Sequence, residues 1–182
     1  GPSVFGCQAP DSGNAEILAK FGTAEQKEKY LKPLLNAEIA SCYSMTEPQA
    51  GADPGEFLCT ATRDGDDWII NGEKWFASHA RFSAFLLVMV VTNPDAPIHE
   101  GASIFLVEQG TPGMEIVRNS AVGPYIEQGD GVHAYISFKD CRVPAENLLG
   151  SEGQGFHVAQ TRLGGGRVHH AMRTVGVIRR AI

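Results

Sequence analysis

Residues 58–78 read LCTATRDGDDWIINGEKWFAS and decide the fold class of this chain. Two runs rich in β-forming residues, 58–62 and 68–70, are separated by Asp64-Gly65-Asp66-Asp67. A turn of this composition between two such runs is typical of a β-hairpin. Asn71-Gly72 is a second turn signal, so we expect residues 68–70 to form a short strand with a turn on each side.

Three further runs have the same character: residues 85–92, 102–108 and 132–138, bounded by clusters of Gly, Pro, Asn and Asp. With no helical pattern between these runs, an antiparallel sandwich or barrel is predicted over residues 39–150. The apolar run 85–91 is far shorter than the roughly 20 residues of a membrane helix. It predicts a buried strand.

Helical patterns lie on both sides of this β region. Residues 13–35 predict two short helices that are broken at Gly22, the second with Thr23 as N-cap and an end at or soon after Pro33. Apolar spacing becomes helical again after Ser151, and Gly164-Gly165-Gly166 should weaken that helix by about 1 kcal/mol per glycine. The fold class is therefore α+β, with an antiparallel, barrel-like middle domain flanked by helices.

The ends suggest where the domains begin. Gly1-Pro2-Ser3 resembles the scar of a cleaved tag, and the chain stops inside an apolar-periodic stretch without a stop signal. We expect helices of a first domain over residues 4–38, the β domain over 39–150 and the first helix of a truncated helical domain over 151–182.

Composition narrows the classes of partner. The 182 residues are 43% hydrophobic and 20% charged, with a net charge of −6, which argues against nucleic acid or an anionic membrane as the main partner. Residues 151–182 are an exception, because five arginines against Glu152 give +4 there and −10 elsewhere. Four scattered cysteines without a C-x-x-C pair predict neither a zinc site nor a disulfide framework, and a reducing compartment fits best.

Four local motifs carry a resemblance to a known family. Residues 45–53 (MTEPQAGAD), 71–78 (NGEKWFAS), 138–150 (FKDCRVPAENLLG) and 152–156 (EGQGF) are similar, in order and spacing, to signature segments of the acyl-CoA dehydrogenase family. The likeness extends from about residue 13 to the end. Residues 162–176 most resemble the subgroup that in animals is fused to an aminoglycoside-phosphotransferase-like domain.

The resemblance implies the family's three-part fold, an FAD cofactor and an acyl-CoA substrate that is desaturated at its α and β carbons. It also implies a homo-oligomer, electron transfer to an electron-transfer flavoprotein, and a location in the bacterial cytoplasm or mitochondrial matrix. No nucleic acid and no membrane span are expected.

The motifs also imply which residues contact the cofactor. Backbone and side chains of residues 43–46 would line the flavin ring. In the turn that follows, the amides of Gly51 and Ala52 would face the pyrophosphate, because glycine allows the backbone to approach phosphate closely. A second aromatic-hydroxyl stretch would shield the ring and donate to flavin N5, with Phe and Ser replacing the family's Trp and Thr. The predicted cofactor residues are Tyr43, Ser44, Met45, Thr46, Gly51, Ala52, Phe76, Ala77 and Ser78. At Ala52 the family's hydroxyl is missing, which removes one bond to phosphate.

The same resemblance assigns the substrate nucleotide to the long helix. Gly164, Gly165, Gly166 and Arg167, together with Ala52, are the predicted substrate residues. A minority of the family places its carboxylate base one residue before this arginine, and here that residue is Gly166, which cannot accept a proton. Most of the family places this base on a late loop of the C-terminal domain, which is expected beyond Ile182. No catalytic residue is therefore predicted in this chain. No metal ligand is predicted either, since the adjacent His169 and His170 cannot chelate one ion. We expect the isolated chain to be inert and to bind FAD weakly.

Other readings of the residues stay open. Glu47 could pair with an arginine of the last helix. An acyl-CoA oxidase or flavin monooxygenase would share these motifs, a flavin-containing DNA-binding relative would use the +4 helix, and a non-enzymatic β module would not copurify with flavin.

Overall fold

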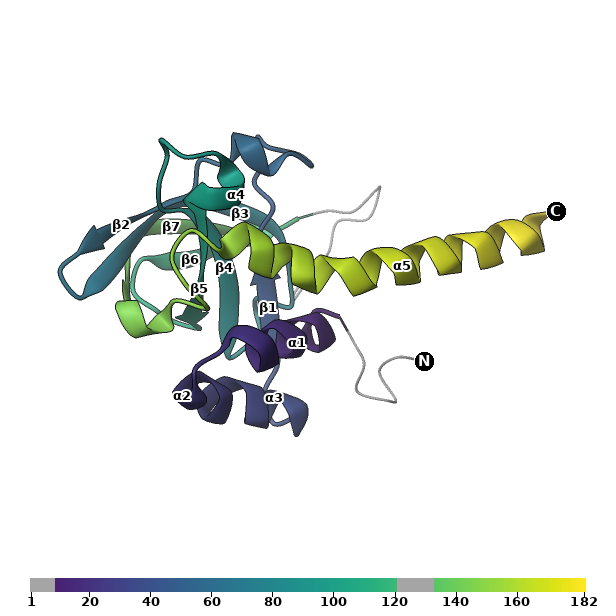
Figure 1. The fold of residues 1–182 in the computed structure, drawn as a ribbon, viewed down its shortest axis with the longest axis horizontal. Coiled ribbons are helices and arrows are strands. Elements are labelled where there is room, and N and C mark those ends of the chain that lie inside the picture. Colours follow the sequence, from purple (N-terminus) through teal and green to yellow (C-terminus); the bar gives the residue numbers. More distant parts are fainter. Residues whose placement is uncertain (1–8, 121–132) are drawn as a thin grey trace.

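The computed structural model describes residues 9–120 and 133–182, so the expected tag remnant Gly1–Ser3, the start of the first domain, Cys7 and Val132 lie outside the described residues. Helices α1 (Asp11–Phe21), α2 (Ala24–Gln26) and α3 (Lys32–Leu35) lie together, with a π-helical turn at Lys27–Leu31 joining the last two (Figure 1). Gly22 ends α1 as predicted, and Thr23 and Gln26 form a reciprocal capping box at the start of α2.

Within the described residues, seven strands form one curled sheet. They are β1 (Ser41–Ser44), β2 (Thr60–Asp64), β3 (Asp67–Ser78), β4 (Phe85–Val91), β5 (Ala102–Glu108), β6 (Met114–Asn119) and β7 (His133–Pro144). The order is β1-β4-β2-β3-β7-β6, with β5 also paired to β4. A short helix α4 (Ile98–Gly101) precedes β5, and the hairpin of β2 and β3 turns at residues 64–67 as predicted.

The α+β class, with a curled sheet flanked by helices, is confirmed, but the sheet is mixed where the prediction was antiparallel. β1 runs parallel to β4, with Ser41 opposite Phe85, and Thr60 pairs with Val91 in the same sense. Parallel strands need a long crossover connection. The chain supplies one, because the β2–β3 hairpin lies between β1 and β4 in sequence.

Asn71-Gly72 is not a turn, and β3 continues through it to Ser78. The pairing of β3 with β7 shifts register between Ile70 and Gly72, and Gly72 has φ +137°. A Cβ added at Gly72 would lie 2.6 Å from the Cα of Cys59. The glycine is therefore needed for a bulge and a close backbone approach inside a strand.

Strand β4 is buried along its whole length because both of its faces are covered. Leu86, Val88 and Val90 belong to one core cluster inside the curled sheet. Phe85, Leu87 and Met89 belong to a second cluster, which α1, α3 and the start of the last helix cover. This two-sided burial explains why the run has no polar alternation.

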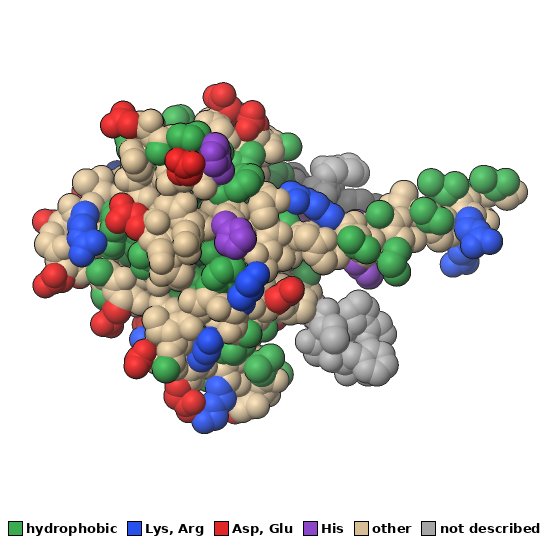
Figure 2. Space-filling model, in the orientation of Figure 1, with side chains coloured by type: hydrophobic (Ala, Val, Ile, Leu, Met, Phe, Trp, Pro, Cys, Tyr) green, Lys and Arg blue, Asp and Glu red, His purple; other side chains and the backbone are tan. Residues whose placement is uncertain are grey.

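The last helix, α5 (Gly155–Ala181), packs by its first turns and then leaves the body of the molecule (Figure 1). Val158 and Ala159 are buried, whereas residues 164–182 are exposed. Figure 2 shows hydrophobic side chains along this projecting part. The exposed hydrophobic residues of α5 include Val168, Met172 and Ile178. The glycine triplet lies inside the continuous helix. In the part of the chain that the structure describes, no helix has the length and apolarity to cross a membrane.

Candidate functional site

The two stretches predicted to line a cofactor lie side by side. The backbone N–H of Trp75 donates to the carbonyl of Thr46 over 3.0 Å. The Nζ of Lys74 donates to the carbonyl of Met45 over 2.9 Å. The segment just after β1 is thereby hydrogen-bonded to the later part of β3, and this contact of Met45 and Thr46 with Lys74 and Trp75 is the junction between the two motifs.

A buried ion pair fastens this junction. Lys74 Nζ lies 2.7 Å from Glu47 Oε1, and the carboxylate also accepts from the backbone N–H groups of Leu58 and Cys59 and from Gln49 Nε2. Burial lowers the pKa of Lys74, while the charge of Glu47 and its hydrogen bond act in the opposite direction. Glu47 therefore pairs with a lysine of β3, which corrects the expectation that an arginine of the last helix is its partner.

A bulge turns Phe76 outward. The register of β3 against β7 shifts between Lys74 and Ala77, and Phe76 has φ +50°, an unusual value for an aromatic residue. Its side chain is 38% exposed and its ring centroid lies 4.6 Å from that of Trp75, while Ala77 is buried. Bulges and strained residues of this kind cluster where a strand re-aims a side chain toward a ligand.

The third residue of this stretch makes a side-chain hydrogen bond. Ser78, at the end of β3, is the register partner of His133, at the start of β7. Ser78 Oγ lies 2.9 Å from His133 Nδ1, and both residues are half-buried.

The members of the first stretch face different surroundings. Thr46 and Met45 are half-buried at the junction, whereas Ser44 is fully buried. The ring of Tyr43 lies under the guanidinium of Arg162, with its centroid 3.9 Å from Cζ, and burial raises the pKa of Tyr43 to about 12. Tyr43 is therefore covered by α5 and does not present an open ring.

The turn that follows has open space around its glycine. Gly51 has φ +56°, and an added Cβ there would have no described atom within 4 Å. Ala52 next to it is exposed. Within the described residues, Ser44 Oγ and Trp75 Nε1 are buried polar atoms without a hydrogen-bond partner, and both flank the junction. An exposed aromatic ring, an open glycine turn and unused donors together suit a planar, phosphorylated cofactor such as FAD.

The predicted substrate residues lie elsewhere. Gly164, Gly165 and Gly166 are exposed on the projecting part of α5, with open space where side chains would stand. Arg167 Nη1 donates to Gln160 Oε1 of the same helix. The described contacts do not bring these residues to the junction, although α5 reaches β1 through Arg162, whose Nε also donates to Asn14.

Comparison with known proteins decides the family. Residues 42–141 match the family model for the acyl-CoA dehydrogenase middle domain. The chain belongs to the acyl-CoA dehydrogenase family. Members of this family are flavoprotein oxidoreductases that bind FAD.

Relatives within the acyl-CoA dehydrogenase family match the whole chain. It is 47% identical to a probable acyl-CoA dehydrogenase, FadE2, of Mycobacterium tuberculosis and covers 45% of that protein. It is 44% identical to human acyl-CoA dehydrogenase family member 11 and covers 24% of it, in agreement with the predicted likeness to the fused animal subgroup. The structure of a putative acyl-CoA dehydrogenase from Mycobacterium abscessus matches with a TM-score of 0.88 at 41% identity, over 96% of this chain and 44% of that one. The chain thus spans less than half the length of these relatives.

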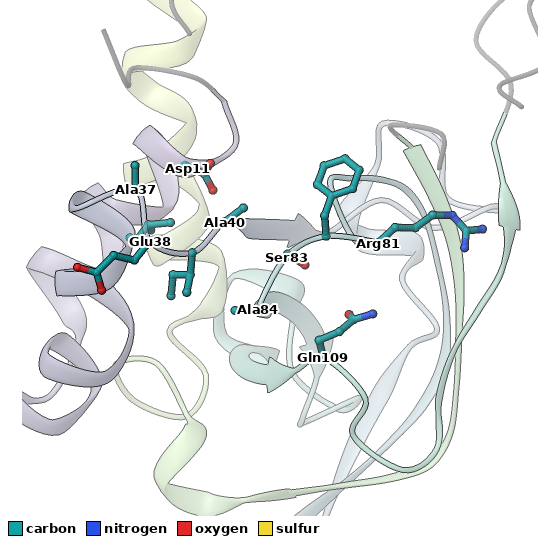
Figure 3. A pocket seen from close by; sticks show the side chains of 11 residues that line it. Asp11, Ala37, Glu38, Ala40, Arg81, Ser83, Ala84 and Gln109 are labelled. Carbon is teal, nitrogen blue, oxygen red and sulfur yellow. The ribbon is translucent and has the colours of Figure 1, made fainter. Parts of the chain in front are cut away.

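A hollow lies apart from the acyl-CoA dehydrogenase motifs. It is enclosed by Asp11, the segment after α3 with Ala37, Glu38 and Ala40, and the loop after β3 with Arg81, Ser83 and Ala84 (Figure 3). None of the predicted cofactor or substrate residues lines it. The hollow is therefore not the predicted site.

Sequence reasoning missed three residues that contact the predicted stretches, namely Lys74, Arg162 and His133. For Lys74 the sequence held one signal. A lysine next to Trp75 inside a strand is expected to be buried, a buried cation requires an anion, and Glu47 lies in the other motif. No such signal marks Arg162 or His133, whose partners are an aromatic ring and a hydroxyl far away in sequence.

Proposed function

We propose that the protein is an FAD-dependent acyl-CoA dehydrogenase that desaturates an acyl-CoA thioester between its α and β carbons. The observation that supports this proposal is the hydrogen bond from the Trp75 N–H to the Thr46 carbonyl, which joins the first motif to the stretch that carries the exposed Phe76. FAD, when bound, supplies the acceptor for the hydrogen that leaves the β carbon as hydride. Residues 39–150 supply the β-domain wall against which it rests.

The residues of the wall have separate tasks in this proposal. Phe76 excludes water from the ring, and Met45 and Thr46 contact the ring edge from the neighbouring stretch. The amides of Gly51 and Ala52 face the pyrophosphate, which the open space at Gly51 permits. Ser78 donates a hydrogen bond to N5. Tyr43, Ser44 and Ala77 contribute backbone or support, because their side chains are covered or buried.

The long helix contributes to substrate binding in the same proposal. Gly164, Gly165 and Gly166 leave room for the nucleotide of acyl-CoA, and Arg167 pairs with its phosphates. Gly166, the residue before Arg167, has no side chain that could accept the α-proton. The catalytic base is therefore at another position. We therefore expect residues 1–182 alone to be inert.

The projecting part of α5 has an exposed apolar face that other helices could cover. Val168, Met172, Val175 and Ile178 are each more than half exposed. We propose that these residues are covered by helices of the C-terminal domain, which begins at residue 151, and by a second copy of the protein. Residues 4–38 form the last helices of the first helical domain in this proposal. An electron-transfer flavoprotein accepts the electrons, in a reducing compartment.

A titration of the full-length protein with FAD tests the proposal. We expect the apoprotein to bind FAD, and acyl-CoA to bleach the bound flavin under anaerobic conditions. Phe76→Asp should weaken FAD binding, because it places a carboxylate against the ring. Phe82→Asp is the matched control, because Phe82 is 51% exposed and is not one of the predicted wall residues. Failure of the unaltered protein to bind FAD, or equal effects of the two variants, would contradict the proposal.

A further inference from the structure

Ser78 and His133 are held opposite each other by the backbone. They are direct register partners in the antiparallel pairing of β3 with β7, so their side chains lie on the same face of the sheet. The carbonyl of His133 also accepts from the N–H of Ser120, which joins the first residue of β7 to the residue that follows β6. The strand pairing thus holds the two side chains next to each other, and Ser78 Oγ lies 2.9 Å from His133 Nδ1.

The same two side chains border the exposed aromatic of the wall. The ring centroids of Phe76 and His133 lie 6.4 Å apart with the planes nearly perpendicular. His133 therefore lies next to both Phe76 and Ser78, and the three side chains form one cluster near the end of β3.

The direction of this hydrogen bond decides what Ser78 can offer. A hydroxyl has one proton, and in neutral imidazole one ring nitrogen donates while the other accepts. If Nδ1 accepts, the Ser78 proton is used up in the bond to His133. If Nδ1 carries the proton, it donates to Oγ, and the Ser78 O–H is left to donate elsewhere.

We propose that His133 is a positioning residue that donates from Nδ1–H to Ser78 Oγ and so directs the Ser78 O–H toward the acceptor nitrogen N5 of the flavin. This inference rests on the proposed function and deepens it, since it names the group that makes the Ser78 proton available. His133 acts only through Ser78 and itself has no contact with the reacting atoms.

The tautomer can be read directly. Nitrogen NMR of the full-length protein labelled at histidine should show Nδ1 of His133 protonated in the FAD-bound state, a readout that does not depend on turnover. Finding the proton on Nε2 alone, with Nδ1 as an acceptor, would overturn the proposal.

Substitutions at His133 and Ser78 give an independent test. In each variant, the flavin reduction potential and the rate of flavin reduction at saturating acyl-CoA are measured. His133→Phe keeps an aromatic ring beside Phe76 but has no donor, and we expect its reduction rate to fall about three- to tenfold, the range of one hydrogen bond. His133→Asn places an amide donor near the position of Nδ1 and should stay within about twofold of the unaltered protein. In a Ser78→Ala background, His133→Phe should cause no further loss in rate or further shift in potential, because the two residues act as one unit.

The outcomes separate this inference from the proposed function. Additive effects of Ser78→Ala and His133→Phe, or an equal loss in His133→Asn and His133→Phe, overturn the role of His133 while FAD binding and reduction of the unaltered protein persist. Absence of FAD binding or of flavin reduction in the unaltered protein is instead a failure of the proposed function. If His133→Phe does not fold, the Asn variant and the NMR measurement still decide the question.

Discussion

Lys74 Nζ and Glu47 Oε1 lie 2.7 Å apart, and their side chains are 0% and 1% exposed. The pair joins the two motifs at the point where the flavin wall is proposed to form. A buried pair is directional, because each partner needs the other and the surrounding donors and acceptors to offset the loss of water. Lys74 Nζ also lies 4.3 Å from the centroid of the Phe57 ring, so strand β3, the segment after β1 and the segment before β2 meet at this ammonium group.

Breaking this pair should be costly. We expect Lys74→Met or Glu47→Gln to lower the free energy of unfolding by about 3 to 5 kcal/mol, because each leaves a buried group without its partner. Lys32→Met is the control, since the Lys32–Glu28 pair is exposed and screened by water, so that its loss should change the stability little. Urea denaturation measures both, and a similar loss in the buried and exposed variants would contradict the assignment.

Gly72 tests the bulge in β3. Gly72→Ala should destabilise the protein by about 3 kcal/mol or more, because its φ of +137° is strained for alanine and the new Cβ meets the Cα of Cys59. Gly65→Ala, at φ +62° with open space around it, should cost about 1 to 2 kcal/mol. Chemical denaturation gives both values, and a reversed order would show that the approach of Gly72 to Cys59 is not close.

Arg162 tests the attachment of α5 to the sheet. Burial lowers the pKa of Arg162, although the guanidinium stays charged at any ordinary pH. We expect Arg162→Met to cost about 2 kcal/mol in stability, through the loss of the Tyr43 contact and of the hydrogen bond to Asn14. Arg63→Met removes the same type of contact at an exposed site, over Trp68, and should cost about 0.5 to 1 kcal/mol. Faster hydrogen exchange in the first turns of α5 should accompany only the first variant; unchanged exchange would argue against this attachment.

The described cysteines should be unreactive in the folded protein. Burial raises the pKa of the Cys59 thiol to about 12 and that of Cys141 to about 11, and it raises the pKa of Cys42 as well. Because only the thiolate reacts, alkylation near neutral pH should be negligible until the chain unfolds. Peptide mass spectrometry after iodoacetamide treatment, with and without denaturant, measures this. Native labelling of Cys42, Cys59 or Cys141 as fast as in denaturant would be inconsistent with the described burial.

Sequence by itself determined the features that depend on neighbouring residues. The 64–67 turn, the Gly22 break and the Thr23 cap follow from local backbone chemistry, and the apolar run of β4 implies burial because it has no polar alternation. Four motifs in order, residues 45–53, 71–78, 138–150 and 152–156, together predicted the family.

Tertiary structure alone decided the relationships between distant residues. The parallel pairing of β1 with β4, the bulge at Gly72, the partner of Glu47 and the contact of His133 with Ser78 each depend on where another segment lies in space. Local patterns carry no information about a strand that arrives from 40 or 50 residues away, whereas the packed sheet admits only one set of neighbours for each buried charge and each strained residue.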